Sequence, residues 1–403
     1  MKPIYYSIPF ANFLIAALLG VLLRSFYVFP IEGMTFLYVL HAHSHLALLG
    51  WLYMLVYVLL VEKFAVKNPK EEKFYQRLFW VTQVSVMGMA VTFPFQGYAA
   101  PSIFFSTLHI ICSYLFVYRI WRYNTLVNKQ LALLVKTALF FMLLSTIGVW
   151  FLGPAVGMMG KTSPFYQLCI QFFLHFQFDG WFLTVFLALL YTQVFREAMN
   201  KQHFQHFYML WIVSVLLSYA LPVSWYIQAP FLYYINSLAV VLQGVAVLYW
   251  IKPLLYRFNT LKQESSPFTT LLLLLAGSCM LLRIGTQFIV LSEQITIDLK
   301  GLRSWIVGFI HLNMLGILTA FGLWLLIHQG KMRMNSLVKA GIISLVIGFL
   351  FTEGLLFVQG VQLLVGFTAI ESTTTWTLLF WFSVFLPLSI SCFFGSYLQK
   401  DKR

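Results

Sequence analysis

The chain has 403 residues, of which 61% are hydrophobic and only 9% charged, whereas soluble domains carry about 25% charged residues. This composition excludes an ordinary soluble protein. The formal net charge of +14 is compatible with nucleic-acid binding, but the basic residues are distributed as a signal for membrane orientation. We therefore expect no nucleic-acid partner.

Apolar segments of transmembrane length recur from one end of the chain to the other. No loop between them is long enough to fold alone, so we expect one transmembrane domain over residues 1–403. The sequence predicts an all-α, polytopic membrane protein with about twelve helices, at residues 8–29, 34–61, 78–95, 102–121, 137–155, 165–194, 207–226, 230–250, 268–290, 304–328, 340–365 and 375–397.

Lysine and arginine are concentrated in alternate loops. Most of the 26 basic residues lie in the tails and in the loops on the same side as the N-terminus, among them 62–77 and 119–136. Cytoplasmic loops carry such an excess in membrane proteins. We therefore predict a multi-pass protein of the bacterial cytoplasmic membrane, surrounded by membrane lipid, with both termini in the cytoplasm.

Six of the nine histidines fall in the outer halves of four predicted spans. Ionisable groups inside a membrane are rare and usually functional, and imidazole is a common ligand of haem and of metal ions. Separate hydrogen bonds between helices are the alternative explanation, but a common depth on four helices favours a shared site. The six are His41, His43, His45, His109, His175 and His311.

Three of these histidines begin the same short pattern, H-x4-G. It occurs at His45–Gly50, His175–Gly180 and His311–Gly316, and each occurrence lies four spans after the previous one. Four is an even number, so the units would be parallel. We predict three four-helix repeats, approximately 1–130, 131–262 and 263–403, around a pseudo-threefold axis. The glycine would let a flat macrocycle or a neighbouring helix approach.

The stretch HAHSHLALLGW places three histidines on one helix. His41 and His45 are four residues apart, about 40° around a helix, and so share a face. His43 points to the opposite side. One helix can therefore serve two sites, and His311 is the best-placed candidate for a facing axial ligand of a haem.

The remaining intramembrane histidines are candidates for a second metal or haem. His175 and His109 are the residues concerned. Gln171 and Asp179 precede and follow His175 by four residues, so either side chain can orient its imidazole. For Asp179, a hydrogen bond that only packs helices together is the alternative.

Three further charged residues lie inside predicted spans. Arg24 and Arg283 are in outer halves, where they suit the anionic propionates of a haem, although Arg24 can instead extend to the membrane interface. Glu353 lies in the middle of its span. It is a candidate for proton relay or for a neutral, hydrogen-bonded carboxyl group.

Together these features resemble subunit I of the haem–copper oxidases, which has twelve helices in three arcs of four. HAHSHLALLGW is similar to the HxHSGALGW stretch of C-family cytochrome oxidases, and the HAH opening resembles the NnrS family of haem-containing membrane proteins linked to nitric oxide stress. The resemblance implies low-spin haem ligands in the His41–His45 cluster and at His311, and a copper ligand at His175. Three features depart from the family: span 7 lacks its tandem histidines, span 10 has one outer histidine where two would ligate two haems, and Asp179 stands where a tyrosine is expected.

We therefore expect a b-type haem protein, with one or two haems, that transfers electrons or reduces or senses oxygen or nitric oxide. The resemblance also allows copper or another metal and an oxidoreductase of the haem–copper type. A separate electron donor, such as a cytochrome or an oxidase-like subunit, would be required. The alternatives are a proton-coupled transporter that uses the histidines and Glu353, and a non-redox factor for haem handling or assembly.

Overall fold

The computed structural model describes residues 2–195, 198–291 and 293–400, and it is helical throughout apart from one isolated bridge between Ala65 and Asn124. Twelve helical segments in this part of the chain are long and apolar enough to cross a membrane, so the predicted class and the number of spans are confirmed. The protein is a multi-pass integral membrane protein. The segments are Ile4–Ser25, Phe36–Phe64, Pro69–Gln96, Ala100–Arg122, Lys129–Met159, Pro164–Val194, Lys201–Ser224, Phe231–Gln263, Pro267–Ile289, Arg303–His328, Ser336–Val365 and Ser372–Gln399.

Several helices extend beyond the apolar segments that revealed them. Helix α4 (Pro69–Gln96) begins nine residues before the predicted start, because the Asn68 side chain accepts hydrogen bonds from the backbone N–H groups of Lys70 and Glu71. Helix α6 (Lys129–Met159) is capped in the same way by Asn128. Hydropathy marks the thickness of the bilayer, whereas capping side chains decide where a helix begins.

The described residues group into two compact units. Unit 1 comprises residues 1–125 and 322–403, and unit 2 comprises residues 126–321. The chain passes from unit 1 to unit 2 after residue 125, close to the repeat boundary expected near residue 130. It returns to unit 1 at residue 322, inside span 10. The single domain and the repeat boundaries stay predictions.

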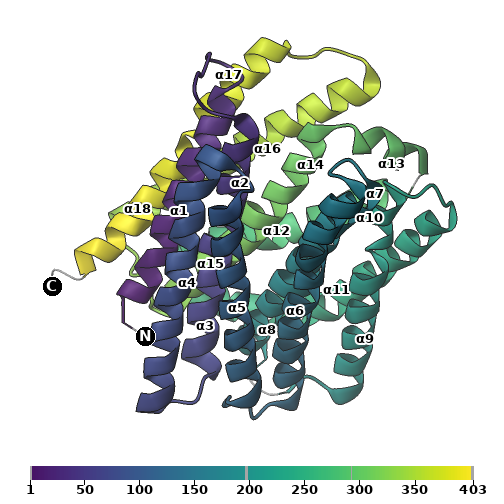
Figure 1. Ribbon diagram of the computed structural model, residues 1–403. Helices are drawn as coiled ribbons and strands as arrows, with labels where there is room; N and C mark the ends of the chain where they lie inside the picture. Colours follow the sequence, from purple (N-terminus) through teal and green to yellow (C-terminus); the bar gives the residue numbers. More distant parts are fainter. Residues whose placement is uncertain (1, 196–197, 292, 401–403) are drawn as a thin grey trace. The chain divides into compact units, whose positions relative to one another are not determined.

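Unit 1 is a bundle in which α1 has a central place (purple in Figure 1). Helix α1 packs against α2 and α18, α4 packs against α2 and α5, and α16 packs against α17 and α18. The rings of Phe13 and Trp51 stack with centroids 4.6 Å apart in its core. Its other helices are α2 (Phe36–His45), α3 (Met54–Phe64), α5 (Ala100–Arg122), α16 (Ser336–Val365), α17 (Ser372–Ser383) and α18 (Phe385–Lys400), with α1 at Ile4–Ser25.

Unit 2 is built on α6, which packs against α7 and α8 (Figure 1). Helix α11 packs against both α9 and α12, which joins the later helices to the same bundle. The other helices of this unit are α7 (Pro164–His175), α8 (Leu183–Val194), α9 (Lys201–Leu217), α10 (Ala220–Ser224), α11 (Phe231–Gln263), α12 (Pro267–Ile289), α13 (Glu293–Lys300) and α14 (Arg303–His311). The chain passes from unit 2 back to unit 1 within α15 (Ala320–His328).

Three spans contain a π-helical segment, which hydropathy does not predict. These segments are η1 (Leu46–Tyr53), η2 (Phe176–Phe182) and η3 (Leu312–Thr319), and they directly follow His45, His175 and His311. The preceding helices α2, α7 and α14 are 10, 12 and 9 residues long, so each histidine lies at a similar distance from the start of its span. Isolated π-helical turns occur frequently at functional sites.

Two of the three glycines of the H-x4-G pattern, Gly50 and Gly180, lie against neighbouring helices. A Cβ atom on Gly50 would lie 3.0 Å from the Cβ of Asn12 in α1, and one on Gly180 would lie 2.7 Å from the Cβ of Phe141 in α6. The sequence allowed either a flat macrocycle or a neighbouring helix to approach these glycines. At Gly50 and Gly180 a neighbouring helix lies close. In each case the approaching helix is the span that precedes the histidine-bearing span.

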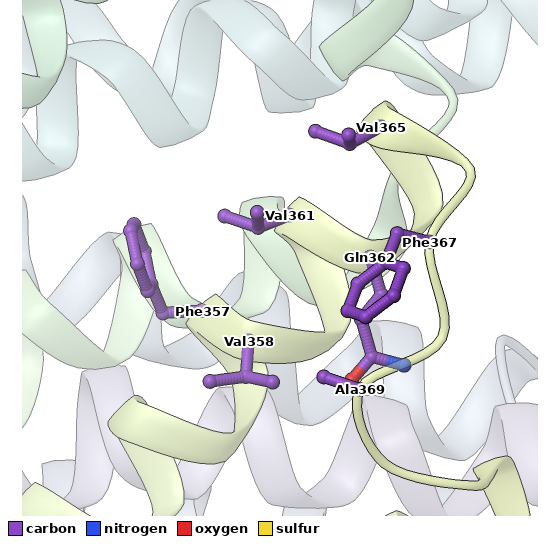
Figure 2. A pocket seen from close by; sticks show the side chains of 7 residues that line it. All are labelled: Phe357, Val358, Val361, Gln362, Val365, Phe367 and Ala369. Atoms are coloured by element: carbon purple, nitrogen blue, oxygen red, sulfur yellow. The ribbon is translucent and has the colours of Figure 1, made fainter.

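The end of α16 carries a shallow apolar hollow of about 170 Å³. Figure 2 shows its lining side chains, which come from α16 and from the loop that follows it. Gln362 holds this loop, because its side-chain amide exchanges two hydrogen bonds with the backbone of Ile370. The lining side chains of the hollow are apolar except for that of Gln362. Its residues are Phe357, Val358, Val361, Gln362, Val365, Phe367 and Ala369.

The close approach at Gly180 gives a test of the packing. We expect Gly180→Ala to lower stability by about 1–3 kcal/mol through overpacking. The control is Gly277→Ala in α12, where a Cβ meets nothing within 4 Å, and where alanine should stabilise the helix by about 1 kcal/mol. Apparent melting temperatures of the purified variants check both signs. An unchanged melting temperature for Gly180→Ala contradicts the packing described.

Candidate functional site

His43 faces helix α1. Its Nδ1–H donates a 2.7 Å hydrogen bond to the backbone carbonyl of Ala16. Gly20 leaves room for the ring, since a Cβ there would lie 3.0 Å from His43 Cε1. A carbonyl can only accept, so the neutral ring carries its proton on Nδ1 and its lone pair on Nε2.

His41 and His45 face the opposite side, as their helical spacing predicts. Both rings contact Tyr98, with centroids 4.7 and 5.9 Å away, and His45 also lies 4.4 Å from the ring of Phe93. The Nδ1–H of His45 donates to the carbonyl of His41 at 2.8 Å, and its Nε2 lies 3.3 Å from the hydroxyl of Tyr98, from which it can accept. His45 therefore has the same tautomer as His43.

His109, from α5, belongs to the same unit as these three histidines. It is 3% exposed, and its ring meets that of Tyr53 edge to face with centroids 4.6 Å apart. Its Nε2 has no hydrogen-bond partner among the described residues. Unit 1 thus contains four of the six predicted histidines.

His175 is held differently in unit 2. Its Nε2–H donates to the backbone carbonyl of Val215 at 2.8 Å, and its Nδ1 lies 3.5 Å from Oδ2 of Asp179. Both ring nitrogens face protein groups, so a metal ion bound here would have to displace one of them. Gln171 instead hydrogen-bonds the hydroxyl of Tyr226, which partly offsets the upward shift that burial causes in the pKa of Tyr226.

Arg283 is fully buried, and its guanidinium donates to four acceptors. Nη2 donates to Oδ1 of Asp179 at 2.5 Å, and Nε donates to Oδ1 of Asn313 at 2.8 Å. Nη1 donates to the side-chain oxygens of Gln243 and Gln287 at 2.8 and 3.1 Å. A haem propionate would have to compete with Asp179, so the predicted propionate role of Arg283 stays a prediction.

The other predicted residues lie on three different helices. His311 ends α14 and is half-buried in unit 2, while Arg24 lies in the last turn of α1 and Glu353 lies in the middle of α16, both half-buried in unit 1. The predicted pairings of His311 with the cluster on α2, and of His175 with His109, each involve both units. They stay predictions.

The three π-helical segments share a kind of contact that the sequence analysis did not predict. In each case a polar side chain from the preceding span bonds to the π-helical segment: Asn12 to the carbonyl of Gly50, Ser145 to Gln177, and Arg283 to Asn313. The available signal was a polar residue within each apolar helix. Such groups need partners inside the protein, because lipid offers none.

A haem iron and a metal ion held by side chains alone need different sets of donor atoms from the protein. Within the described ranges, no three His, Cys, Asp or Glu side chains are grouped to hold a metal ion. A haem iron needs only one or two axial nitrogens because the porphyrin supplies the other four. His43 and His45 each direct a lone-pair Nε2 away from the backbone carbonyl that holds the ring.

Comparisons with known proteins give no assignment: no protein-family model matches the chain, and no curated protein shows significant sequence similarity to it.

The ion pair in unit 2 gives a test of how the spans are held together. Arg283→Met should destabilise the protein by about 3–5 kcal/mol, because it leaves the carboxylate of Asp179 buried without its cation. In the double variant Asp179→Leu/Arg283→Met the uncompensated charge is removed, so much of this loss should be recovered. Thermal unfolding of the single and the double variant measures the difference in their stability. A single variant as stable as the natural protein contradicts the role of the pair.

Proposed function

We propose that this protein binds b-type haem, one or two per chain, and transfers electrons or reduces or senses oxygen or nitric oxide. One observation carries the proposal. Two histidines on opposite faces of α2, His43 and His45, have their Nδ1–H groups anchored on backbone carbonyls. A ring anchored in this way carries its lone pair on Nε2, which is the arrangement that metal-binding histidines use. At His45 the iron would replace the Tyr98 hydroxyl, which lies 3.3 Å from Nε2.

Neighbouring groups hold both imidazole rings in fixed orientations. The carbonyls of Ala16 and His41 fix the orientation of the two imidazoles and raise the basicity of Nε2. Phe93 and Tyr98 cover His45 on its side of the helix. A haem bound here would supply redox chemistry and a site for a diatomic gas, while the protein supplies ligands and excludes water.

We further propose the partners of these ligands. His311 is the candidate for a second axial ligand, and Arg24 and Arg283 are candidates for the propionates. A copper or other metal ion at His175 and His109 is a separate proposal, and it requires His175 to give up one of its present contacts.

The arrangement of the chain is proposed as three parallel four-helix repeats around a pseudo-threefold axis. Its support is that the π-helical segments η1, η2 and η3 each follow a histidine and each bond to the preceding span. We place the protein in a bacterial cytoplasmic membrane with both termini in the cytoplasm, because its basic residues are concentrated on that side. Its electron donor would be a separate cytochrome or oxidase-like subunit.

A dithionite-reduced minus oxidised absorption spectrum of the purified protein tests haem binding. We expect sharp reduced α and Soret bands, and a loss of intensity in His43→Ala and in His45→Ala because each removes an axial ligand. His203→Ala is the matched control, since His203 is exposed on α9. A shift of the bands with carbon monoxide would show an open coordination position and favour gas chemistry.

A colourless protein from haem-replete cells contradicts the proposal. The proton-coupled transporter, with Glu353 as the first residue to replace, then becomes the leading alternative. Substoichiometric haem that exchanges readily would instead favour haem handling or assembly.

A further inference from the structure

Helices α4 and α5 of unit 1 form a hairpin whose basic end is held together by side chains. The two helices pack against each other (Figure 1). At this end, Nη1 of Arg119 in α5 donates a 3.0 Å hydrogen bond to Oε1 of Glu71 in α4. The guanidinium also lies 4.2 Å from the ring centroid of Phe74, and the side chain of Asn68 caps the start of α4. These contacts fix the ends of the two helices to each other.

Three basic side chains at this end remain available to a partner outside the protein. Lys73 and Arg77 on α4 and Arg122 on α5 are exposed, and none of them forms an ion pair or a side-chain hydrogen bond with another residue of the described ranges. Outside the ion pair with Arg119, the acidic residue of the two helices is Glu72. Positive charge is therefore in excess on this surface.

The exposed face of α4 changes in character along the helix. Its members are three or four residues apart, so they lie on one side of the helix. At about 1.5 Å per residue, Trp80 lies about 5 Å and Val84 about 10 Å along the axis from Arg77. The order from the basic end is thus cationic, aromatic and aliphatic, in the exposed residues Lys73, Arg77, Trp80, Val84 and Met87.

The exposed face of α5 has the same order. From the basic end it carries Arg122, Tyr118, Leu115 and Ile111, again three or four residues apart and all exposed. Because α5 runs in the opposite direction to α4, its sequence spells this order in reverse. The order therefore follows the distance from the basic end and not the direction of the chain.

This order matches the layers of a phospholipid. The headgroup and interfacial region of each leaflet is about 5–8 Å thick, which is close to the spacing between Arg77 and Trp80. Tryptophan and tyrosine prefer the level of the headgroups, and aliphatic side chains prefer the acyl chains. A phosphate beside the three cations would place its glycerol near the aromatic rings and its acyl chains along Val84 and Leu115. A headgroup that carries its own cation would be repelled there, so the charge selects a lipid with a net negative charge.

We propose that the α4–α5 hairpin binds an anionic glycerophospholipid, with its phosphate at Lys73, Arg77 and Arg122 and its acyl chains on the aliphatic faces of the two helices. Charge complementarity identifies this occupant. The contacts of Arg119 with Glu71 and Phe74 hold the two helices in register for it. The site does not depend on bound haem, so its test is independent of the haem proposal.

Native mass spectrometry of the purified full-length protein in a mild detergent tests the site. The protein is titrated with dioleoylphosphatidylglycerol or with dioleoylphosphatidylcholine, which have the same acyl chains. We expect several-fold tighter binding of the anionic lipid. Arg77→Gln/Arg122→Gln should weaken that binding about tenfold or more, because each basic residue beside an anionic lipid surface contributes about fivefold, and should leave binding of phosphatidylcholine unchanged.

Two further variants identify the cause. Lys201→Gln/Lys252→Gln removes the same charge from exposed positions in unit 2 and should leave the tight binding intact. Arg77→Lys/Arg122→Lys keeps both charges and should retain most of the affinity. Equal binding of the two lipids by the natural protein, or equal losses in the glutamine pair and in either of these variants, overturns the proposal.

A competition experiment separates a lipid site from a site for free phosphate. Glycerol 3-phosphate carries the phosphate without acyl chains, so it should not displace phosphatidylglycerol at the same concentration. Displacement at that concentration would show that the acyl chains contribute nothing, and it would overturn the assignment to a lipid.

Discussion

The inability of lipid to form hydrogen bonds is the constraint on which this structure depends. Every polar group inside a span must be satisfied by the protein or by bound water. Arg283 shows the constraint most fully, because its side chain is completely buried and donates to Asp179, Asn313, Gln243 and Gln287. A single charged residue thereby joins α11, α12, η2 and η3.

The same constraint explains why π-helical segments and polar side chains occur together. A π-helical turn interrupts the regular bonding of the helix, and its backbone groups then need other partners. At Gly50 the partner is Asn12, which is itself held by two hydrogen bonds to Gln83. The absence of a side chain at Gly50 and at Gly180 lets the preceding span approach. The histidine before each π-helical segment thus lies next to a contact that fixes two spans together.

The two units use their histidines in different ways. In unit 1, backbone carbonyls hold the Nδ1 atoms of His43 and His45, so each neutral ring carries its lone pair on Nε2, and Nε2 of His45 lies 3.3 Å from the Tyr98 hydroxyl. In unit 2, the ring of His175 lies between a backbone carbonyl and Asp179, and it acts as part of a charged network with Arg283. The histidines that begin the H-x4-G pattern, His45 and His175, therefore have different partners in the two units. This difference is why we propose the haem ligands in unit 1.

The sequence by itself determined the helical class, the twelve spans and the opposite faces of His41 and His43, because apolar length and helical periodicity are local properties. It also indicated that Asp179 and Arg283 need partners, since isolated charges are costly in a membrane. Only the tertiary structure decided that these two residues pair with each other, that His175 turns its Nε2 to Val215, and that Tyr53 meets His109. These contacts join residues far apart in the chain, so they depend on how the helices pack rather than on any local pattern.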